Sequence, residues 1–481
     1  MRVCIVVEGC YPYVVGGVSS WVHSMIRSFP NIDFVILAII SGRDMSGKFV
    51  YELPENVSQV YEVYLSDDDW RVQKRNARGK RLKKDDYQAL RSLIRNRDLE
   101  WNRVFDIFRR KDVSVDRILM GEDFLRIVKE VYDAEYPQIV FSDFLWTMRS
   151  IYLPLFLVLK TKIPKADLYH CVCTGYAGVL GSMATHFHNS RLMISEHGIY
   201  TREREEELIR AKWVMGIYKN IWIEQFRKMS NLAYMRADIV TSLFEHAREL
   251  QIEIGCPEEK TVVTPNGVNT ERLQNLPGKT KEDEGLINIG AVLRVTAIKD
   301  VKTMIQAFHY AFQKDNRLRL YLMGPTNEEP EYAAECQDMC EYLGIQDVVI
   351  FTGRIDIRDY LGRMDMTILT SISEGQPLTI LEGFAAHLPA IATDVGNCSG
   401  LIYGEHDNYG PAGIVAHVMN TEEISDAMLE LARDPEKRKA YGEAGYQRVL
   451  HGYRIEDMKK KYEELYRYFA DEFGFQWEGG E

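Results

Sequence analysis

The stretch from residue 270 to residue 294, TERLQNLPGKTKEDEGLINIGAVLR, divides the chain into two halves of the same kind. Residues 270–285 are polar and contain no apolar run of strand length, which is typical of an interdomain linker. From Gly285 onward a new series of apolar strands and amphipathic helices begins. A chain of 481 residues is also too long for a single core. We therefore predict domains over 1–270 and 286–452, joined by a linker over 271–285.

Both halves alternate short apolar runs with amphipathic helical patterns, which indicates parallel α/β architecture. The fold class that follows is α/β, with two doubly wound, Rossmann-like domains facing across a cleft at the carboxyl ends of their strands. In the first half, the runs that predict strands are 2–7, 33–40, 138–141, 167–172, 191–195, 238–242 and 261–264. In the second half, strands are predicted within 285–294, 318–325, 348–353, 366–371 and 389–394, and helices over 301–314, 331–344 and 359–364.

A charged, helix-prone insert over about 67–135 interrupts the first series. Its segment 71–84, RVQKRNARGKRLKK, has eight basic residues in fourteen. One interpretation is a solvated helical lobe, and the other is a contact with an acidic partner or an anionic membrane surface. The last segment, 453–481, predicts an amphipathic helix that crosses back to the first domain.

The composition excludes some classes of protein. The hydrophobic fraction is 46%, as in ordinary globular proteins, and the net charge of −12 argues against a general nucleic-acid binder. Eight scattered cysteines without a C-x-x-C pair predict buried reduced thiols and a cytoplasmic protein. No signal peptide fits the N-terminus, and the most apolar stretch, 151–160, is half the length that spans a bilayer.

Two loops carry residues suited to phosphate. Gly16 and Gly17 lie between the first predicted strand and helix, where paired glycines let backbone amides approach an anion. A plain tight turn is the alternative reading of these glycines. Arg294 and Lys299 follow the first strand of the second domain, and two cations at a strand end suit a diphosphate.

Residues 373–384, SEGQPLTILEGF, carry the strongest local signal. Pro377 fits the first position of a helix, which places Glu374 in the preceding loop and Glu382 in the second helical turn. The backbone amides near the helix start form an anion site aimed at the cleft. The residues of this site are Glu374, Gly375, Gln376, Pro377, Leu378, Thr379 and Glu382.

Together these features resemble the retaining glycosyltransferases of family 4, which have the GT-B fold. The resemblance rests on Glu374 and Glu382, Arg294 with Lys299, the paired glycines, and the motifs SEHG and TPNGVN. More narrowly, EGCYPYVVGGVSSWVH, EHGIYTRERE, GPTNEEPEYAAEC and TSISEGQPLTILE resemble the cytosolic transferases of Pel exopolysaccharide synthesis. This likeness covers nearly the whole chain, including the helical insert.

The resemblance implies a role for each residue. Glu374 would meet a hydroxyl of the donor sugar near the reacting carbon, and Glu382 would hold the ribose hydroxyls. His197, in SEHG, would meet the donor sugar near its anomeric centre. Arg294, Lys299 and the Gly17 amide would bind the diphosphate. The three residues Tyr200, Arg202 and Arg204 are candidates for the acceptor side or for the surface between the domains.

The reaction implied is transfer of a hexose or N-acetylhexosamine, with retention, from a UDP-sugar to a growing exopolysaccharide. The predicted catalytic residues are Glu374, His197, Arg294 and Lys299. No cofactor or metal is expected, because the cations and helix amides offset the charge of the leaving UDP, and the acidic run at 66–70 lies in the insert. The expected partners are the polysaccharide acceptor and inner-membrane Pel synthase and export subunits, which would place the protein at the inner face of the membrane.

Three other functions use similar features. A glycoside hydrolase needs two carboxylates facing each other across a sugar, whereas Glu374 and Glu382 both come from one helix start. A UDP-sugar epimerase of the GT-B fold would form product without an acceptor. A nucleotide-binding scaffold subunit would bind UDP without transfer.

This chain also departs from the family pattern at His387, and at Gly396 with Asn397. Both departures are expected near the nucleotide, where they put the selectivity for the base or the sugar in doubt.

Overall fold

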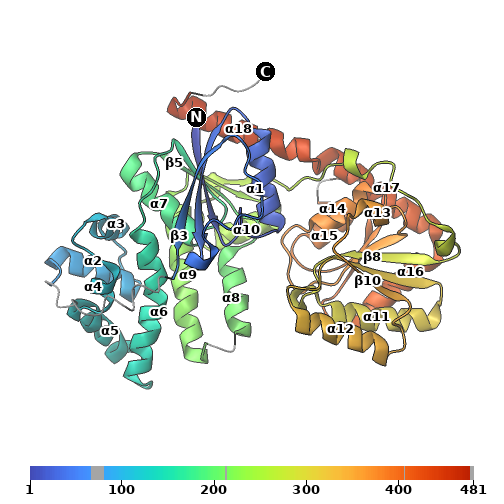
Figure 1. Ribbon diagram of the computed structural model, residues 1–481, viewed down its shortest axis with the longest axis horizontal. Coiled ribbons are helices and arrows are strands. Elements are labelled where there is room, and N and C mark those ends of the chain that lie inside the picture. The colour runs from blue at the N-terminus through green and yellow to red at the C-terminus, as the bar shows by residue number, and fades with distance from the viewer. Residues whose placement is uncertain (67–80, 212–213, 406, 477–481) are drawn as a thin grey trace. The chain divides into compact units, whose positions relative to one another are not determined.

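The computed structural model describes residues 1–66, 81–211, 214–405 and 407–476. The chain forms two compact units (Figure 1). The first unit comprises Met1–Val263 with Glu464–Glu481, and the second comprises Thr264–Glu463. Each is built around its own parallel sheet with helices packed on it, so the prediction of two Rossmann-like α/β domains is confirmed.

The first unit contains a seven-stranded sheet in the order β3-β2-β1-β4-β5-β6-β7. Its pairs are parallel, and Val3 of β1 aligns with Leu168 of β4. The chain runs outward from β1 to β3 and then returns to β1 through β4, so the switch point lies between β1 and β4. The strands are β1 (Arg2–Glu8), β2 (Asp33–Ile40), β3 (Val57–Tyr64), β4 (Leu168–Cys171), β5 (Arg191–Ser195), β6 (Ile239–Ser242) and β7 (Thr261–Val263).

Helices of the first unit form two groups. Figure 1 shows α1 alongside the sheet and a separate helical lobe of α2 to α5 packed on α6. The lobe corresponds to the predicted helical insert. The helices are α1 (Gly17–Ser28), α2 (Lys84–Arg95), α3 (Trp101–Arg109), α4 (Val115–Leu119), α5 (Glu122–Glu135), α6 (Phe141–Leu159), α7 (Tyr176–His188), α8 (Tyr200–Arg210), α9 (Gly216–Arg236) and α10 (Glu245–Glu253).

The predicted strand at 138–141 is wrong, because α6 begins at Phe141. Its apolar letters belong to the start of a helical pattern, in which Phe144, Met148, Ile151 and Leu155 are buried at spacings of three and four. Residues 67–80, which include most of the basic segment and of the acidic run, lie outside the described residues.

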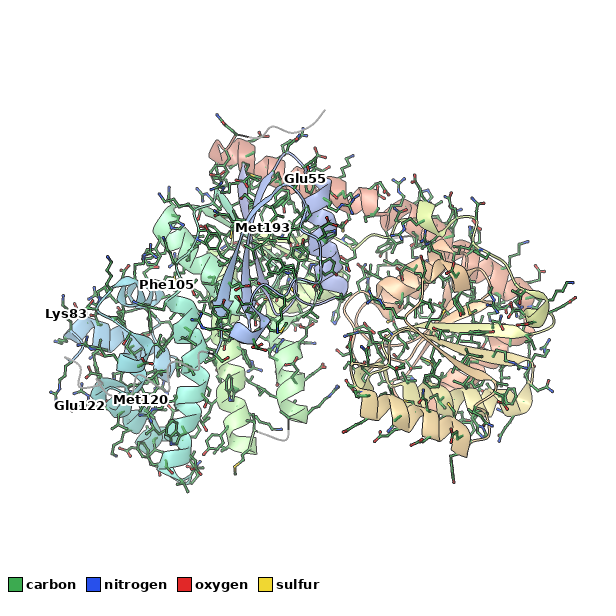
Figure 2. All side chains as sticks on the ribbon, viewed as in Figure 1. Glu55, Lys83, Phe105, Met120, Glu122 and Met193 are labelled. Atoms are coloured by element: carbon green, nitrogen blue, oxygen red, sulfur yellow. The ribbon has the colours of Figure 1, made fainter. Side chains whose placement is uncertain are left out.

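A buried lysine of α9 holds the helical lobe to the rest of the first unit. Phe105 in the lobe and Met193 on β5 are both fully buried (Figure 2). Lys228 of α9 donates to the Leu93 carbonyl at 2.6 Å and to the Tyr152 hydroxyl at 3.0 Å. Burial lowers the pKa of Lys228 to about 7. The lobe is therefore tied to α9 by a polar contact that is shielded from water.

The second unit contains a six-stranded parallel sheet in the order β10-β9-β8-β11-β12-β13. Its switch point lies between β8 and β11, where Met366 aligns with Ile289. The strands are β8 (Ile287–Val292), β9 (Leu318–Met323), β10 (Val349–Gly353), β11 (Met366–Leu369), β12 (Ala390–Thr393) and β13 (Gly413–Ala416). The helices are α11 (Val301–Lys314), α12 (Pro330–Tyr342), α13 (Arg358–Leu361), α14 (Leu378–Ala385), α15 (Cys398–Tyr403), α16 (Thr421–Arg433), α17 (Pro435–Gly452) and α18 (Ile455–Phe473).

The final helix, α18, contributes residues to both units. Tyr466, near its end, is buried in the first unit and lies 2.8 Å from Nδ1 of His170 on β4. In the described part of the chain, no helix has the length and apolarity needed to cross a membrane.

Candidate active site

The loop after β8 carries the two predicted phosphate-binding cations. Arg294 lies two residues beyond β8, and its Nη1 donates to Glu328 Oε2 at 2.6 Å. The backbone N–H of Ala297 donates to Glu329 Oε2 at 3.0 Å. Glu328 and Glu329 therefore fix the loop from one side, through one side chain and one backbone amide.

Lys299 and Glu374 meet at the switch point of the second sheet, because their loops follow β8 and β11. Lys299 Nζ lies 2.5 Å from Glu374 Oε1, and the two side chains are only 17% and 12% exposed. Ser371 Oγ donates to the same oxygen at 2.5 Å. The structure thus brings together the lysine and the loop glutamate that the sequence predicted, and adds Ser371, which sequence reasoning missed.

The two loops are also joined through their backbones. Ile372 N–H donates to the Ile298 carbonyl at 2.9 Å, and Thr370 Oγ1 donates to the Lys299 carbonyl at 3.1 Å. These bonds set the position of the lysine relative to the glutamate before any ligand arrives. Such preorganisation is what electrostatic stabilisation of a leaving group requires.

The start of α14 lies just beyond Glu374. Pro377 is the N-cap and α14 begins at Leu378, so the predicted first helical position for Pro377 is wrong by one residue. The first amides of a helix have no partner within the helix, and they favour a negative charge. The amides of Leu378 and Thr379 occupy this position.

Gln376 connects this loop to the segment TPNGVN. Its Oε1 accepts from the Asn266 backbone N–H at 2.7 Å, and both residues are buried. The Nε2 group of Gln376 has no hydrogen-bond partner among the described residues. A buried amide of this kind is a candidate donor to a ligand.

Glu382 lies in the second turn of α14, as predicted. Burial raises its pKa to about 7, and Arg272 opposes this shift. Glu382 therefore keeps its proton to a higher pH than an exposed glutamate does. Its neighbours Gly383, Phe384 and Ala385 are buried, and a Cβ at Gly383 would lie 2.9 Å from the Thr367 side chain.

The two departures from the family pattern occupy different places. Gly396, with a φ of +54°, packs on the glutamate loop, where a Cβ would lie 2.3 Å from the Glu374 and Gly375 carbonyls. Asn397 N–H donates to the Gly375 carbonyl at 2.9 Å. His387 instead lies beyond the far end of α14, where it stacks on Tyr446 with ring centroids 3.8 Å apart. His387 therefore does not pack on the glutamate loop as Gly396 does.

In the first unit, the paired glycines stand at the start of α1. Gly16 precedes the helix as its N-cap, as predicted, whereas Gly17 is already the first helical residue. A Cβ at either position would meet nothing within 4 Å. Space beside both residues leaves the first amides of α1 open to a ligand.

His197 follows β5 in the same unit. The preceding Glu196 is buried and accepts from Tyr234 OH at 2.6 Å and from Gln251 Nε2 at 2.9 Å. Burial raises the pKa of Glu196, and it lowers the pKa of His197 to about 4. The Nε2 atom of His197 has no hydrogen-bond partner among the described residues. The imidazole is thus neutral at physiological pH, and its Nε2 atom is buried without a partner among the described residues.

Tyr200 has a structural position within the first unit. It is 4% exposed and donates to Glu8 Oε1 at 3.0 Å. Arg204 lies over its ring and pairs with Glu207 at 2.7 Å. The candidate role of Tyr200 on the acceptor side is not supported by this burial, whereas Arg202 is exposed.

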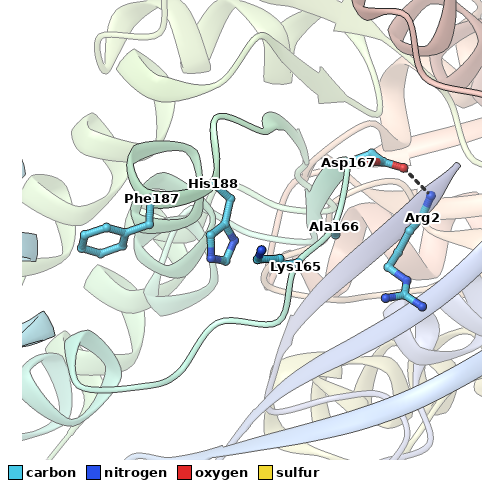
Figure 3. Close-up of a pocket in the computed structure, with 6 residues that line it drawn as sticks. All are labelled: Arg2, Lys165, Ala166, Asp167, Phe187 and His188. Carbon is cyan, nitrogen blue, oxygen red and sulfur yellow. Dashed lines mark hydrogen bonds between the residues drawn. The ribbon is translucent and has the colours of Figure 1, made fainter.

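A separate cavity of about 540 Å³ opens at the other end of the first sheet (Figure 3). It lies where β1 and β4 begin, and the Arg2 backbone N–H donates there to Asp167 Oδ2 at 2.7 Å. It contains none of the predicted site residues. Its lining is Arg2, Lys165, Ala166, Asp167, Phe187 and His188.

Comparison with known families covers most of the chain. Residues 1–259 match the model described as a domain of unknown function, DUF3492. Residues 274–448 match the model described as glycosyl transferases group 1. Residues 260–273 separate the two matches, and the predicted linker over 271–285 begins within this gap.

Among characterised relatives, the chain is 28% identical over 190 residues to N-acetyl-alpha-D-glucosaminyl L-malate synthase of Bacillus anthracis. This match covers 39% of the chain and 46% of that protein. The chain is also 26% identical over 302 residues to the putative glycosyltransferase EpsD of Bacillus subtilis, covering 59% of the chain and 72% of EpsD. The chain thus spans about half the length of the first relative.

Solved structures with the same fold cover the whole molecule. Anabaena Alr3699/HepE in complex with UDP aligns with a TM-score of 0.62 at 14% identity, covering 97% of this chain and 100% of that one. Sucrose-phosphate synthase from Thermosynechococcus elongatus aligns with a TM-score of 0.61 at 13% identity, covering 98% and 99%. At this identity the likeness concerns the fold alone. The chain belongs to the DUF3492 family, its second half is a glycosyl transferases group 1 domain, and its fold is GT-B.

Proposed function

We propose that this protein is a retaining glycosyltransferase that moves a hexose or N-acetylhexosamine from a UDP-sugar to a growing exopolysaccharide of the Pel type. The observation that carries the proposal is the buried contact between Lys299 and Glu374, at the switch point of a glycosyl transferases group 1 domain. In open α/β sheets, ligands bind outside the carboxyl ends of the strands at such a switch point.

Arg294, Lys299 and the first amides of α14 supply positive charge for a diphosphate. Lys299 is held by Glu374 and by the backbone bonds of its loop, so little reorganisation is needed as UDP leaves. In this proposal the leaving phosphate takes the acceptor proton, and attack occurs on the face that UDP leaves. Glu374 contacts a hydroxyl of the donor sugar.

Glu382 contacts the ribose in the same proposal. With a pKa of about 7, it can both donate to and accept from the paired ribose hydroxyls. Gln376 offers its unpartnered Nε2 group to the same ligand. The N-terminal amide of Gly17 and the neutral imidazole of His197 are the contributions proposed for the first unit.

The named relatives support a UDP-linked donor and glycosyl transfer. HepE was solved with UDP, and EpsD is named as a putative glycosyltransferase. The polysaccharide acceptor and inner-membrane Pel subunits are proposed partners at the cytoplasmic face. Copurification of the protein with those subunits from solubilised membranes tests the partners separately from the chemistry.

A panel of UDP-hexoses and UDP-N-acetylhexosamines, measured for binding and turnover, tests the donor class. Wild type is compared with Glu374→Ala and with Glu436→Ala, an exposed glutamate in the first turn of α17. We expect one donor to bind and turn over in wild type and in Glu436→Ala, and turnover to be lost in Glu374→Ala. Full activity in Glu374→Ala would refute the site.

The same panel separates the alternative functions. An epimerase would convert the donor to a second UDP-sugar without an acceptor. A scaffold subunit would bind UDP and show no transfer with any acceptor.

A further inference from the structure

Trp21 lies between two histidines of the first unit. It belongs to the first turns of α1, which Figure 1 shows alongside the sheet, and its side chain is 7% exposed. The Trp21 ring stands edge-on to His197, with centroids 4.4 Å apart and planes at 67°. It also meets His170 of β4 at 5.8 Å and 88°. Three rings from three separate segments therefore pack together.

The His170 ring is the immobile member of this group. It is fully buried, with Nδ1 2.8 Å from Tyr466 OH and Nε2 2.8 Å from Ser195 Oγ. Both ring nitrogens are engaged, so the imidazole plane cannot rotate without breaking a buried hydrogen bond. An indole packed against this plane has little freedom to move.

His197 is held differently. Its Nε2 atom has no hydrogen-bond partner in the part of the chain that the structure describes. The orientation of the His197 ring therefore depends on packing. The ring of Trp21, with its centroid 4.4 Å from that of His197, supplies an aromatic contact.

We infer that Trp21 is a positioning residue, which holds the His197 imidazole in the orientation that leaves Nε2 available to the donor sugar. The inference rests on the proposed function, because His197 is assigned to the donor by family resemblance. The chain of contacts is Tyr466 to His170, His170 to Trp21, and Trp21 to His197. It links the C-terminal helix to the histidine loop.

The chemical consequence concerns turnover more than donor affinity. A misplaced His197 would still leave the diphosphate and ribose contacts of the second unit intact. A small displacement of a group near the reacting carbon lowers the rate by about 10- to 100-fold. We therefore expect loss of Trp21 to lower kcat and to leave the KM for the UDP-sugar nearly unchanged.

Two substitutions of Trp21 and one matched control test this inference. Trp21→Leu removes the aromatic edge, and Trp21→Phe retains an aromatic ring. Phe29→Leu is the control, because Phe29 packs on Tyr466 at 5.3 Å in the same core without being the ring that contacts His197. We expect kcat to fall about 10- to 100-fold in Trp21→Leu, and to stay within about 3-fold of wild type in Trp21→Phe and Phe29→Leu.

A nuclear magnetic resonance measurement reports the packing of the Trp21 indole against the His197 ring directly. The protein is labelled with ¹³C at the ε1 position of its eleven histidines, and the His197 signal is assigned with His197→Gln. An indole this close shifts the His197 ring proton by its ring current. The shift should persist in Phe29→Leu and disappear in Trp21→Leu.

Two results would overturn the inference. One is an unchanged His197 signal in Trp21→Leu, and the other is a kcat in Trp21→Leu equal to that of Phe29→Leu. A wild-type protein that turns over no UDP-sugar would instead remove the proposed function. The ring-current measurement is independent of turnover, so the two failures are distinguishable.

Discussion

Lys299 Nζ lies 2.5 Å from Glu374 Oε1, in a contact that leaves both side chains less than one-fifth exposed. Ser371 Oγ donates to the same carboxylate oxygen. The lysine belongs to the loop after β8 and the other two residues to the loop after β11. Two strands that are separate in sequence but adjacent in the sheet thus place a cation and a carboxylate side by side.

Removal of this lysine should impair the chemistry. Lys299→Ala takes away one of the proposed cations and leaves Glu374 without its partner, so we expect kcat/KM for the UDP-sugar to fall about 10²- to 10³-fold. Lys302→Ala is the matched control, because Lys302 lies three residues after Lys299, is 40% exposed and pairs with Glu335 at 2.5 Å. Steady-state kinetics with both variants decide the matter, and equal activity in the two would contradict the role of Lys299.

The pairing of Arg294 with Glu328 predicts a change in donor affinity. Glu328 neutralises the guanidinium in the free protein, at 2.6 Å and with both side chains about half exposed. A diphosphate must compete with this carboxylate. We expect Glu328→Gln to lower the Kd for UDP by a few-fold, since exposed ion pairs are worth about 0–1 kcal/mol, and Arg294→Ala to raise it. Calorimetric titration measures both, and a weaker affinity in Glu328→Gln would oppose the proposed competition.

Glu382 should make stability depend on pH. Its pKa is raised from 4.5 to about 7, so the unfolded chain loses this proton at lower pH than the folded protein does. Its contribution to stability is complete below pH 4.5 and is lost as the pH rises to about 7. Glu382→Gln should therefore melt at a higher temperature than wild type at pH 8. The corresponding gain in unfolding free energy is on the order of 2 kcal/mol.

At pH 4.5, Glu382→Gln should melt close to wild type. Thermal unfolding at the two values of pH, with Glu436→Gln as an exposed control, makes the comparison. A Glu382→Gln protein less stable than wild type at pH 8 would contradict the buried position of this carboxyl group.

The buried histidines His170 and His197 make stability depend on pH in the opposite direction. Burial lowers the pKa of His197 to about 4, and burial together with His197 lowers that of His170 to about 3. The unfolded chain binds these protons near pH 6.5, before the folded protein does. Stability from these two rings is thus complete above pH 6.5 and falls as the pH drops toward 4.

His170→Gln should flatten this acid dependence. Differential scanning calorimetry between pH 7 and pH 4 measures it, with His417→Gln as a control at an exposed histidine. A wild-type melting temperature that does not fall over this range would show that the rings are not held neutral.

The expected independence from metal has a direct check. Positive charge for the leaving UDP comes from Arg294, Lys299 and the α14 amides in the proposed mechanism. We therefore expect the rate of transfer to be unchanged by excess EDTA. Activity that disappears with the chelator and returns with Mg²⁺ or Mn²⁺ would contradict the proposal that transfer needs no metal ion.

Much of the second unit was predictable because its signals are local. The apolar runs of β8, β9 and β11 are short and buried, and the loops that follow them carry the charged residues of the site. The positions of Lys299 and Glu374 after two strands of one sheet put them at the same edge. Their contact follows from strand order, which the sequence does not state.

Other features needed the tertiary structure. β3 was missed because it is an edge strand in which only Val63 is buried, and β13 because it has only four residues and begins with glycine. The segment at 138–141 was misread since three apolar letters fit a strand as well as the start of α6. The contact of Trp21 with His197 has no local sequence signal, because it joins helix α1 to a loop more than 170 residues away.

The proposed function is the addition of sugar residues to an acceptor from a UDP-linked donor, at the Lys299–Glu374 site. The most direct measurement is the number of sugars added to an acceptor oligosaccharide per UDP released, by mass spectrometry, in wild type and in Glu374→Ala. We predict one sugar added per UDP in wild type, and at least a 100-fold lower rate in the variant. Release of UDP without elongation, or full elongation by Glu374→Ala, would contradict the account.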